Sequence, residues 1–230
     1  MSILAIIAAA GQGSRMESAA RKQYMYLEGI PVLARSLNLF LEQRRVDEIV
    51  AVIPPGDREE VLALLQPYCS GAEIRLIEGG ATRQESVSRG LKASSVQADL
   101  VCIHDAARPL ASPALLEALL DAAESFGAAV PVIPLSDTVK EVDRQGNIIS
   151  TPVRESLRLV QTPQVFRREI ITEAYRYAGK HNLTATDDAS LVEALGRPVK
   201  TVSGEQFNLK ITSLRDLMLA SLFLKGTAVK

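Results

Sequence analysis

Residues 3–16 read ILAIIAAAGQGSRM, an uncharged apolar strand that runs directly into a loop of small residues. Such an Ile-rich run is typical of strands buried on both faces of a parallel sheet. The loop contains Gly11 and Gly13 and lies at the carboxyl end of the strand, where open α/β sheets bind ligands. There the backbone can approach a phosphate closely, and Arg15 and Lys22 supply positive charge for its oxygens. The stretch favours a polyphosphate site, although the two glycines alone fit a tight turn equally well.

Further apolar runs recur along the chain and alternate with stretches of helical periodicity. The expected strands are Ile3–Ala9, Glu48–Ile53, Glu73–Ile77, Leu100–Ile103, Ala129–Ile133 and Val199–Val202. The expected helices are Val32–Leu41, Arg58–Leu65, Gln84–Ala93, Ala114–Ser125, Glu169–Ala178 and Ser213–Leu224. Two helix starts carry capping signals, namely Ser112 before Pro113 and a box formed by Ser213 and Asp216. The alternation predicts a single α/β domain over residues 1–230, with a doubly wound, mostly parallel, Rossmann-like sheet.

One segment interrupts this alternation. Thr138–Val142 and Ile148–Thr151 flank residues 143–147, a turn-rich loop of hairpin length. The residues alone fit an inserted β-hairpin and a short extension of the main sheet about equally well. A protruding arm, at about residues 136–154, would expose strand edges that pairing in a homodimer would cover.

Composition narrows the classes of partner. The chain has 230 residues and a formal net charge of −1 without a long run of like charge, which disfavours nucleic acid or an anionic membrane surface. No segment approaches the roughly 18 consecutive apolar residues of a membrane-spanning helix, and no basic flank of a signal peptide precedes the first strand. We therefore expect a cytoplasmic protein that binds small molecules. Cys69 and Cys102 are too few and too widely spaced for a thiolate metal site and are expected to be buried thiols.

Two more polar motifs follow expected strands at the same edge of the sheet. Residues 79–87 read GGATRQESV, and amides and carbonyls beside the glycines suit hydrogen bonding to the edge of a flat base, whereas a plain turn and helix cap is the simpler alternative. Residues 104–109 read HDAARP. In this motif Asp105 could hold ribose hydroxyls or a metal and Arg108 a phosphate. The alternative is an ion pair between Asp105 and Arg108 beside a core histidine.

Other nucleotide-binding and catalytic patterns are disfavoured. Met16 stands where a dinucleotide fingerprint needs a third small residue, and the second strand ends in Ile53 and two prolines rather than an acidic residue. The first loop also lacks the Lys-Ser/Thr pair of a P-loop. His104 and His181 lie on different motifs, so no nucleophile–base pair is apparent.

Taken in order, these motifs resemble those of 2-C-methyl-D-erythritol 4-phosphate cytidylyltransferases over nearly the whole chain. The matching segments are residues 9–16, 22–24 (KQY), 79–87, 104–109, 162–164 (TPQ), 186–187 (TD) and 208–212 (NLKIT). The resemblance implies transfer of CMP from CTP to 2-C-methyl-D-erythritol 4-phosphate, which yields 4-diphosphocytidyl-2-C-methyl-D-erythritol and pyrophosphate in non-mevalonate isoprenoid biosynthesis. It also implies a requirement for Mg²⁺ and in-line attack by the acceptor phosphate on the α-phosphorus. No general base is needed, because a phosphate monoester is largely dianionic near neutral pH.

The resemblance assigns roles residue by residue. The expected catalytic residues are Arg15 and Lys22 at the triphosphate, Lys210 near the α-phosphate, and Arg154. The expected nucleotide-binding residues are Ala9, Ala10, Gly11, Gly13, Gly80, Arg83, Ser86, Asp105 and Ala106. The expected acceptor-binding residues are Thr138, Arg108, Arg154 and Thr186. In this family the arm embraces a second subunit, so a homodimer with an active site shared between chains is expected, while the metal ligands stay unassigned.

Two alternatives differ in substrate or class. Ribitol 5-phosphate cytidylyltransferases are similar in fold and most motifs, but residues 8–11 (AAAG) and 105–108 (DAAR) favour the methylerythritol enzyme. A non-catalytic nucleotide-binding module would bind CTP without needing Lys22 or Lys210 near the α-phosphate. One departure from the family pattern is Ala81-Thr82, where relatives often carry an acidic residue, so the contacts to the cytosine edge in that turn are left open.

Overall fold

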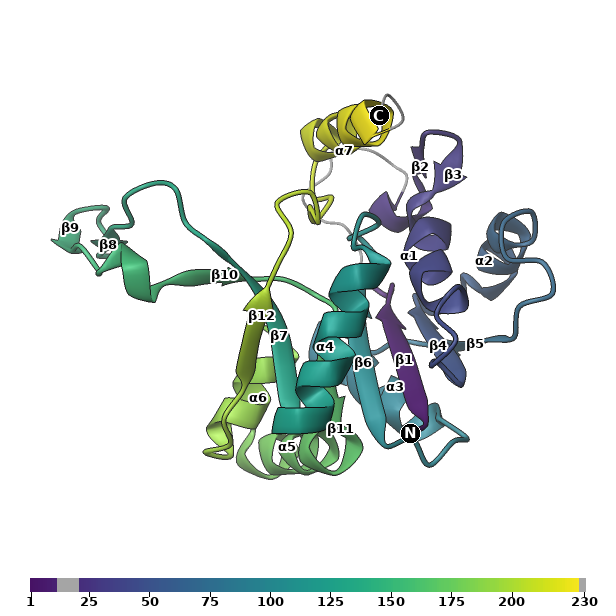
Figure 1. Ribbon diagram of the computed structural model, residues 1–230, viewed down its shortest axis with the longest axis horizontal. Coiled ribbons are helices and arrows are strands. Elements are labelled where there is room, and N and C mark those ends of the chain that lie inside the picture. The colour runs from purple at the N-terminus through teal and green to yellow at the C-terminus, as the bar shows by residue number, and fades with distance from the viewer. Residues whose placement is uncertain (12–20, 228–230) are drawn as a thin grey trace.

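The computed structural model describes residues 1–11 and 21–227, and its centre is an eight-stranded sheet (Figure 1). The strands follow the order β10-β7-β11-β6-β1-β4-β5, with β12 pairing to β7. Their bounds are β1 (Ile3–Ala8), β4 (Glu48–Ile53), β5 (Ile74–Glu78), β6 (Leu100–Asp105), β7 (Ala128–Pro134), β10 (Arg158–Val160), β11 (Gln164–Arg167) and β12 (Lys200–Ser203). The helices are α1 (Val32–Leu41), α2 (Arg58–Leu65), α3 (Arg83–Ala93), α4 (Pro113–Phe126), α5 (Arg168–His181), α6 (Asp188–Ala194) and α7 (Leu214–Thr227).

The sheet is parallel in one half and mixed in the other. Strands β5, β4, β1 and β6 are parallel neighbours, and β12 is parallel to β7. In contrast, β11 runs antiparallel to both β6 and β7, and β10 runs antiparallel to β7. The predicted doubly wound, mostly parallel fold is confirmed, whereas β10, β11 and α6 were not predicted.

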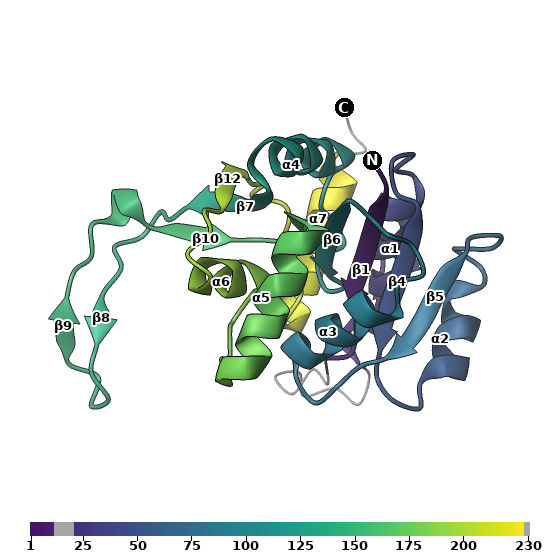
Figure 2. The same ribbon diagram turned by 90° about the horizontal axis from the view of Figure 1, so that it is seen from below.

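The helices cover both faces because successive residues of β1 point to opposite sides. Ile3, Ala5 and Ile7 pack with α1, α2 and α4, whereas Leu4 and Ile6 pack with α3, α5 and α6. All five side chains are fully buried. Figure 2 shows α4 on the opposite side of the sheet from α3, α5 and α6. This double burial explains why the first strand reads as an unbroken apolar run.

Local signals set several element ends. Ser112 caps α4 through a hydrogen bond that its hydroxyl accepts from the Leu115 amide, with Pro113 at the first helical position. Ser213 and Asp216 exchange reciprocal bonds across the start of α7, which confirms the predicted capping box. The predicted strand ends need correction at the site, since β1 ends at Ala8 rather than Ala9 and β6 continues through Asp105. The cause is pairing, because Ala8 is in register with Asp105.

The inserted hairpin forms a separate two-stranded sheet of β8 (Glu141–Val142) and β9 (Ile148–Ser150). Both views show it as an arm that projects from the body beyond β10 (Figures 1 and 2). This excludes the alternative of an extension of the main sheet. At the tip the strands end where predicted, because the Asp143 carboxylate accepts hydrogen bonds from the Gln145 and Asn147 amides and forms the expected turn. The strands are shorter than predicted at the opposite end, where residues 138–140 and 151 lie outside the ladder.

Three short elements, η1 (Lys22–Tyr24), β2 (Tyr26–Leu27) and β3 (Ile30–Pro31), lead from the first loop to α1, and η2 (Arg154–Ser156) lies at the base of the arm. Within the described residues, none of the helices is both long and apolar enough to cross a membrane. Cys69 and Cys102 are both free thiols, as predicted. Cys102 is buried in β6 as expected, whereas Cys69 is only half-buried rather than buried.

Candidate active site

A cavity of about 710 Å³ lies at the carboxyl ends of β1 and β6. Its walls come from the first loop, the turn before α3, the end of β6 and the segment before α7. The predicted site residues that line it are Ala9, Ala10, Gly11, Lys22, Gly80, Arg83, Ser86, Asp105, Ala106 and Lys210. The predicted residues Gly13 and Arg15 lie outside the described residues. Motifs far apart in the sequence therefore meet where the parallel strands end.

Close packing between glycine and alanine shapes the wall of this cavity. A Cβ atom on Gly79 would lie 2.3 Å from the Cβ of Ala10 and 2.7 Å from the Oγ of Ser86. The Gln23 side chain, which is buried, donates to the carbonyls of Ala9 at 2.8 Å and Gly11 at 3.2 Å. Gln23 thus fixes the start of the first loop. The sequence did not reveal this role, because there Gln23 looks like an ordinary member of a pair of polar residues.

The turn before α3 is held by its own side chains. Thr82 caps the helix by accepting a hydrogen bond from the Glu85 amide at 3.0 Å. The Ser86 hydroxyl donates to the Thr82 carbonyl at 2.8 Å and accepts from the Gly80 amide at 3.1 Å. The Glu85 carboxylate accepts from the Ala81 amide at 2.9 Å. Ser86 therefore shapes the turn in this structure, and its predicted contact with a base stays a prediction.

Asp105 stands at the centre of the charged part of the site. Its Oδ1 lies 2.9 Å from Arg83 Nε and its Oδ2 lies 2.6 Å from Lys210 Nζ. Burial alone would raise the pKa of Asp105, but the charges of Arg83 and Lys210 outweigh it and hold the pKa well below its usual range. The alternative of an Asp105–Arg108 ion pair is wrong, because Arg108 instead donates to the Asn208 carbonyl at 2.8 Å.

His104 is a core residue rather than a base. Its Nε2 lies 3.0 Å from the Arg108 carbonyl and its Nδ1 lies 3.1 Å from Thr162 Oγ1, which also accepts from the Asp105 amide. The carbonyl can only accept, so Nε2 carries the proton and Nδ1 accepts from the threonine. Burial lowers the pKa of His104 to about 4, so the ring is neutral near pH 7. It links the end of β6 to the adjoining loops.

A second, smaller cavity of about 330 Å³ adjoins the first. Arg83, Asp105 and Lys210 line both cavities, so the Asp105 cluster lies at their junction. The predicted acceptor residues Arg108 and Thr186 line the second cavity. Its remaining lining residues are Val160, Gln161, Thr162, Gln164, Asp187, Ser190 and Glu193, for which sequence reasoning had assigned no role.

Two predicted acceptor residues are not brought into either cavity within one chain. Thr138 and Arg154 lie exposed on the arm. The Arg154 guanidinium donates to the Ser136 carbonyl at 2.7 Å and lies 3.5 Å from the Glu155 carboxylate. Neither residue lines a cavity of its own chain, and the arm that carries them projects from the body (Figure 1).

The described residues do not form a protein-held metal centre. Over residues 1–11 and 21–227 there is no group of three or more His, Cys, Asp and Glu side chains that could hold a metal ion. Both oxygens of Asp105, the carboxylate at the junction of the cavities, are already bound by Arg83 and Lys210. A cation at this site would have to draw its ligands from a bound molecule and water.

Comparison with known proteins identifies the family. The model of the 2-C-methyl-D-erythritol 4-phosphate cytidylyltransferase family matches residues 3–226. The chain belongs to this family. Proteins of that name from Pelotomaculum thermopropionicum and Dehalococcoides mccartyi are 43% and 44% identical to this cytidylyltransferase, over 97% and 96% of its length and 94% and 95% of theirs.

Solved structures agree with the sequence comparison. The cytidylyltransferase resembles the 2-C-methyl-D-erythritol 4-phosphate cytidylyltransferase of Thermus thermophilus with a TM-score of 0.80 and 38% identity, over 98% of this chain and 100% of that one. The 4-diphosphocytidyl-2C-methyl-D-erythritol synthase of Anaerococcus prevotii gives a TM-score of 0.85 and 34% identity, over 97% and 96%. Family membership makes this cytidylyltransferase a nucleotidyl-transferring enzyme of isoprenoid biosynthesis.

Proposed function

We propose that this enzyme uses its two adjoining cavities to transfer CMP from CTP to 2-C-methyl-D-erythritol 4-phosphate, releasing pyrophosphate. The observation that carries the proposal is the cluster of Arg83, Asp105 and Lys210 at the junction of the cavities. Small residues line the larger cavity, whose volume of about 710 Å³ lies in the range usual for small-molecule sites. Polar side chains dominate the lining of the smaller one.

The nucleotide would bind in the larger cavity in one orientation. The cytosine would lie between the first loop and the turn at Gly80, where backbone groups beside small residues can reach a base edge. The ribose would lie by Asp105 and Ala106, and the triphosphate would run toward Gly11 and Lys22. We expect Gly13 and Arg15, which lie outside the described residues, to contribute to triphosphate binding as the resemblance implies. The α-phosphate would then stand near Lys210, facing the smaller cavity.

The chemistry requires positioning and charge neutralisation rather than a base. An oxygen of the acceptor phosphate attacks the α-phosphorus, a new P–O bond forms, and the bond to the β-phosphate oxygen breaks, so that pyrophosphate leaves with the electron pair. Cations at Lys22 and Lys210 would stabilise the charge that develops on the leaving group and at the reacting phosphorus. The neutral, fully bonded His104 matches a reaction in which no side chain has to take a proton.

The acceptor is tested directly by pyrophosphate release from CTP and magnesium, with methylerythritol phosphate and ribitol phosphate supplied in parallel. We expect release with methylerythritol phosphate only. Faster release with ribitol phosphate would establish the ribitol alternative. Binding of CTP without pyrophosphate release in either arm would establish a non-catalytic nucleotide-binding module.

We further propose that Mg²⁺ enters with the triphosphate, held by phosphate oxygens and water, and supplies neutralisation of the leaving pyrophosphate. The engaged oxygens of Asp105 support this arrangement. Adding EDTA should therefore abolish turnover, and excess Mg²⁺ should restore it. The thermal midpoint of the nucleotide-free enzyme should shift by less than about 1 °C, because a metal that does not bind the free protein cannot stabilise it. A clear drop in that midpoint with EDTA would instead indicate a protein-held metal.

The arm supports a dimer with a shared site. Its strands are only two and three residues long, and a two-stranded hairpin of this size is marginally stable by itself in water. Apolar side chains on the arm are more than half exposed, at 54% for Val142, 64% for Ile148 and 60% for Ile149. A second copy of the chain would cover them and would bring Thr138 and Arg154 to the partner's acceptor cavity.

Deleting residues 138–151 tests this arrangement. The base of the arm is already closed by the bond from Arg154 to the Ser136 carbonyl, so the shortened chain can join without unfolding the body. We expect monomers in sedimentation analysis and a strong loss of turnover, with CTP binding retained in calorimetry. A fully active monomer would eliminate the shared site.

A further inference from the structure

Asp188 is a buried carboxylate outside both cavities, and the reaction proposed above does not use it. It is the first residue of α6 and only 1% exposed. Its Oδ2 lies 2.8 Å from Arg83 Nη1 in an ion pair, and its Oδ1 accepts a hydrogen bond of 2.5 Å from the Tyr175 hydroxyl. A buried charge this far from water needs such partners, so the position is structurally demanding.

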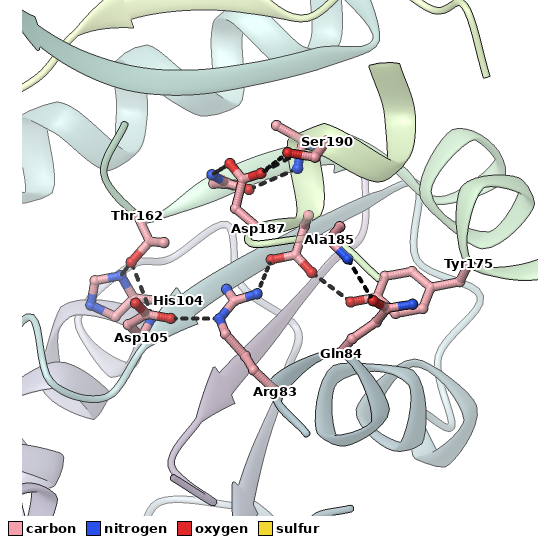
Figure 3. A network of polar contacts seen from close by, with 12 residues as sticks. Arg83, Gln84, His104, Asp105, Thr162, Tyr175, Ala185, Asp187 and Ser190 are labelled. Atoms are coloured by element: carbon pink, nitrogen blue, oxygen red, sulfur yellow. Dashed lines mark hydrogen bonds and ion pairs between the residues drawn. The ribbon is translucent and has the colours of Figure 1, made fainter. Parts of the chain in front are cut away.

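Arg83 connects Asp188 to the junction of the cavities. Figure 3 shows its contact with Asp105. Its Nη1 faces Asp188, whereas its Nε binds Asp105 Oδ1 at 2.9 Å, leaving Asp105 Oδ2 for Lys210. The result is a line of alternating charge from α6 to the site: Asp188, Arg83, Asp105 and Lys210. The two carboxylates and two cations balance, and the Arg83 and Asp105 side chains are only 28% and 10% exposed.

Gln84, the residue after Arg83, fixes the separation of Arg83 and Asp188. Gln84 donates from Nε2 to the Leu183 carbonyl at 3.0 Å and accepts at Oε1 from the Ala185 amide at 3.1 Å. These bonds clasp the loop before α6 to the first turn of α3 (Figure 3). The backbone that carries Asp188 is therefore held against the backbone that carries Arg83. The Arg83 side chain is thus constrained both at its backbone and at its guanidinium.

We propose that Asp188 is a positioning residue, which orients Arg83 so that Arg83 binds one oxygen of Asp105 and leaves the other to place the Lys210 ammonium at the junction. Without the charge of Asp188, the Arg83 guanidinium is free to rotate and to donate two N–H groups to the two oxygens of Asp105. Such a bidentate pair is the preferred geometry of a guanidinium with a carboxylate. That rotation would draw Asp105 away from Lys210. The proposal rests on the proposed function, because its effect is measured on the transfer reaction.

The test is a double-mutant cycle on kcat/KM for CTP, using Asp188→Asn, Asp105→Asn and the combination. We expect Asp188→Asn to lower kcat/KM by about 10- to 100-fold, in line with small displacements of reacting groups. In the Asp105→Asn background the same change should cost less than about 3-fold, because the link it acts through is gone. The positioning role would be overturned if the two single losses in kcat/KM multiply in the double variant, or if Asp188→Asn has the kcat/KM of the wild type.

Glu173→Gln is the matched control. It also neutralises an acidic residue of the α5–α6 region, one that pairs with Arg197 at 3.9 Å on the surface without a path to Asp105. Its kcat/KM should equal that of the wild type. A wild-type enzyme that releases no pyrophosphate would defeat the proposed function, whereas an active wild type with multiplying losses would defeat only the role of Asp188.

Removing a buried charge can prevent folding, so a second variant keeps the test decisive. Tyr175→Phe deletes one of the two partners of Asp188 and leaves all four charges in place. If Asp188→Asn gives no soluble protein, Tyr175→Phe takes its place in the cycle. It should lower kcat/KM several-fold in the wild-type background, whereas the double variant with Asp105→Asn should have the same kcat/KM as Asp105→Asn alone. Wild-type kcat/KM in Tyr175→Phe would then overturn the proposal.

Discussion

Replacing Lys22 by alanine should lower kcat by about 30- to 1000-fold, which corresponds to roughly 2–4 kcal/mol of transition-state stabilisation. Lys22 opens the short helix η1 and lines the larger cavity. Its backbone is fixed, because the Met25 amide binds the Lys22 carbonyl and Gln23 is bonded to the first loop. A cation held in this way needs no reorganisation when negative charge moves onto the leaving pyrophosphate. Steady-state kinetics at saturating CTP and acceptor measure the loss.

The adjacent Arg21 provides the comparison for Lys22. Arg21 also lines the cavity, but its guanidinium is ion-paired with Asp57, with Nε 3.1 Å from Oδ2. We expect Arg21→Ala to cost less in kcat than Lys22→Ala, because the family resemblance assigns the transition-state role to Lys22 and none to Arg21. We expect Arg15→Ala to behave like Lys22→Ala. A Lys22→Ala enzyme with kcat within about 3-fold of the wild type would refute the role of Lys22 in the transition state.

The parallel half of the fold was predictable because strands that are buried on both faces have a simple sequence pattern. Strands such as β1 and β6 are covered by helices on both faces, so each is an unbroken apolar run that needs no knowledge of the rest of the chain. The antiparallel half has no such pattern in the sequence. Strand β11 has only four residues, and α6 has seven, both too short for a periodic pattern to distinguish them from loop.

The composition of the site was more predictable than its pairings. Motifs after parallel strands had to meet at one edge, which placed Asp105 and Arg108 at the site. Which arginine binds Asp105 depends on side-chain directions that the spacing does not contain. The nearer Arg108 turns to the Asn208 carbonyl, a hundred positions away, and Arg83 takes its place.

The buried role of Asp188 was hidden for a related reason. Asp187 and Asp188 stand together at a helix start, where acidic residues are common as caps. Asp187 does cap α6, with its Oδ1 accepting from the Ser190 amide at 3.1 Å. Nothing in the local sequence shows that its neighbour faces inward to Arg83, because that contact is made by an element about a hundred residues earlier.

Replacing Lys210 by alanine should lower kcat by about 100-fold or more, with a smaller change in KM for CTP. Lys210 lines both cavities, so its ammonium stands where the acceptor phosphate and the α-phosphate would meet. The charge that it neutralises is greatest when both phosphates crowd one phosphorus, which makes its contribution larger in the transition state than in the ground state. Single-turnover measurements with preloaded enzyme would isolate this step from product release.

Stability separates this catalytic loss from damage to the fold. The Lys210 side chain is 40% exposed, and Asp105 keeps Arg83 as a partner when the ammonium is removed. Ion pairs with such an exposed member contribute little to folding, so the thermal midpoint of Lys210→Ala should lie within about 2 °C of the wild type. A variant with normal kcat but a raised KM would show that Lys210 binds the ground state and the transition state equally well. Because the same residue bounds both cavities, that result would also place the reacting phosphorus elsewhere than at their junction.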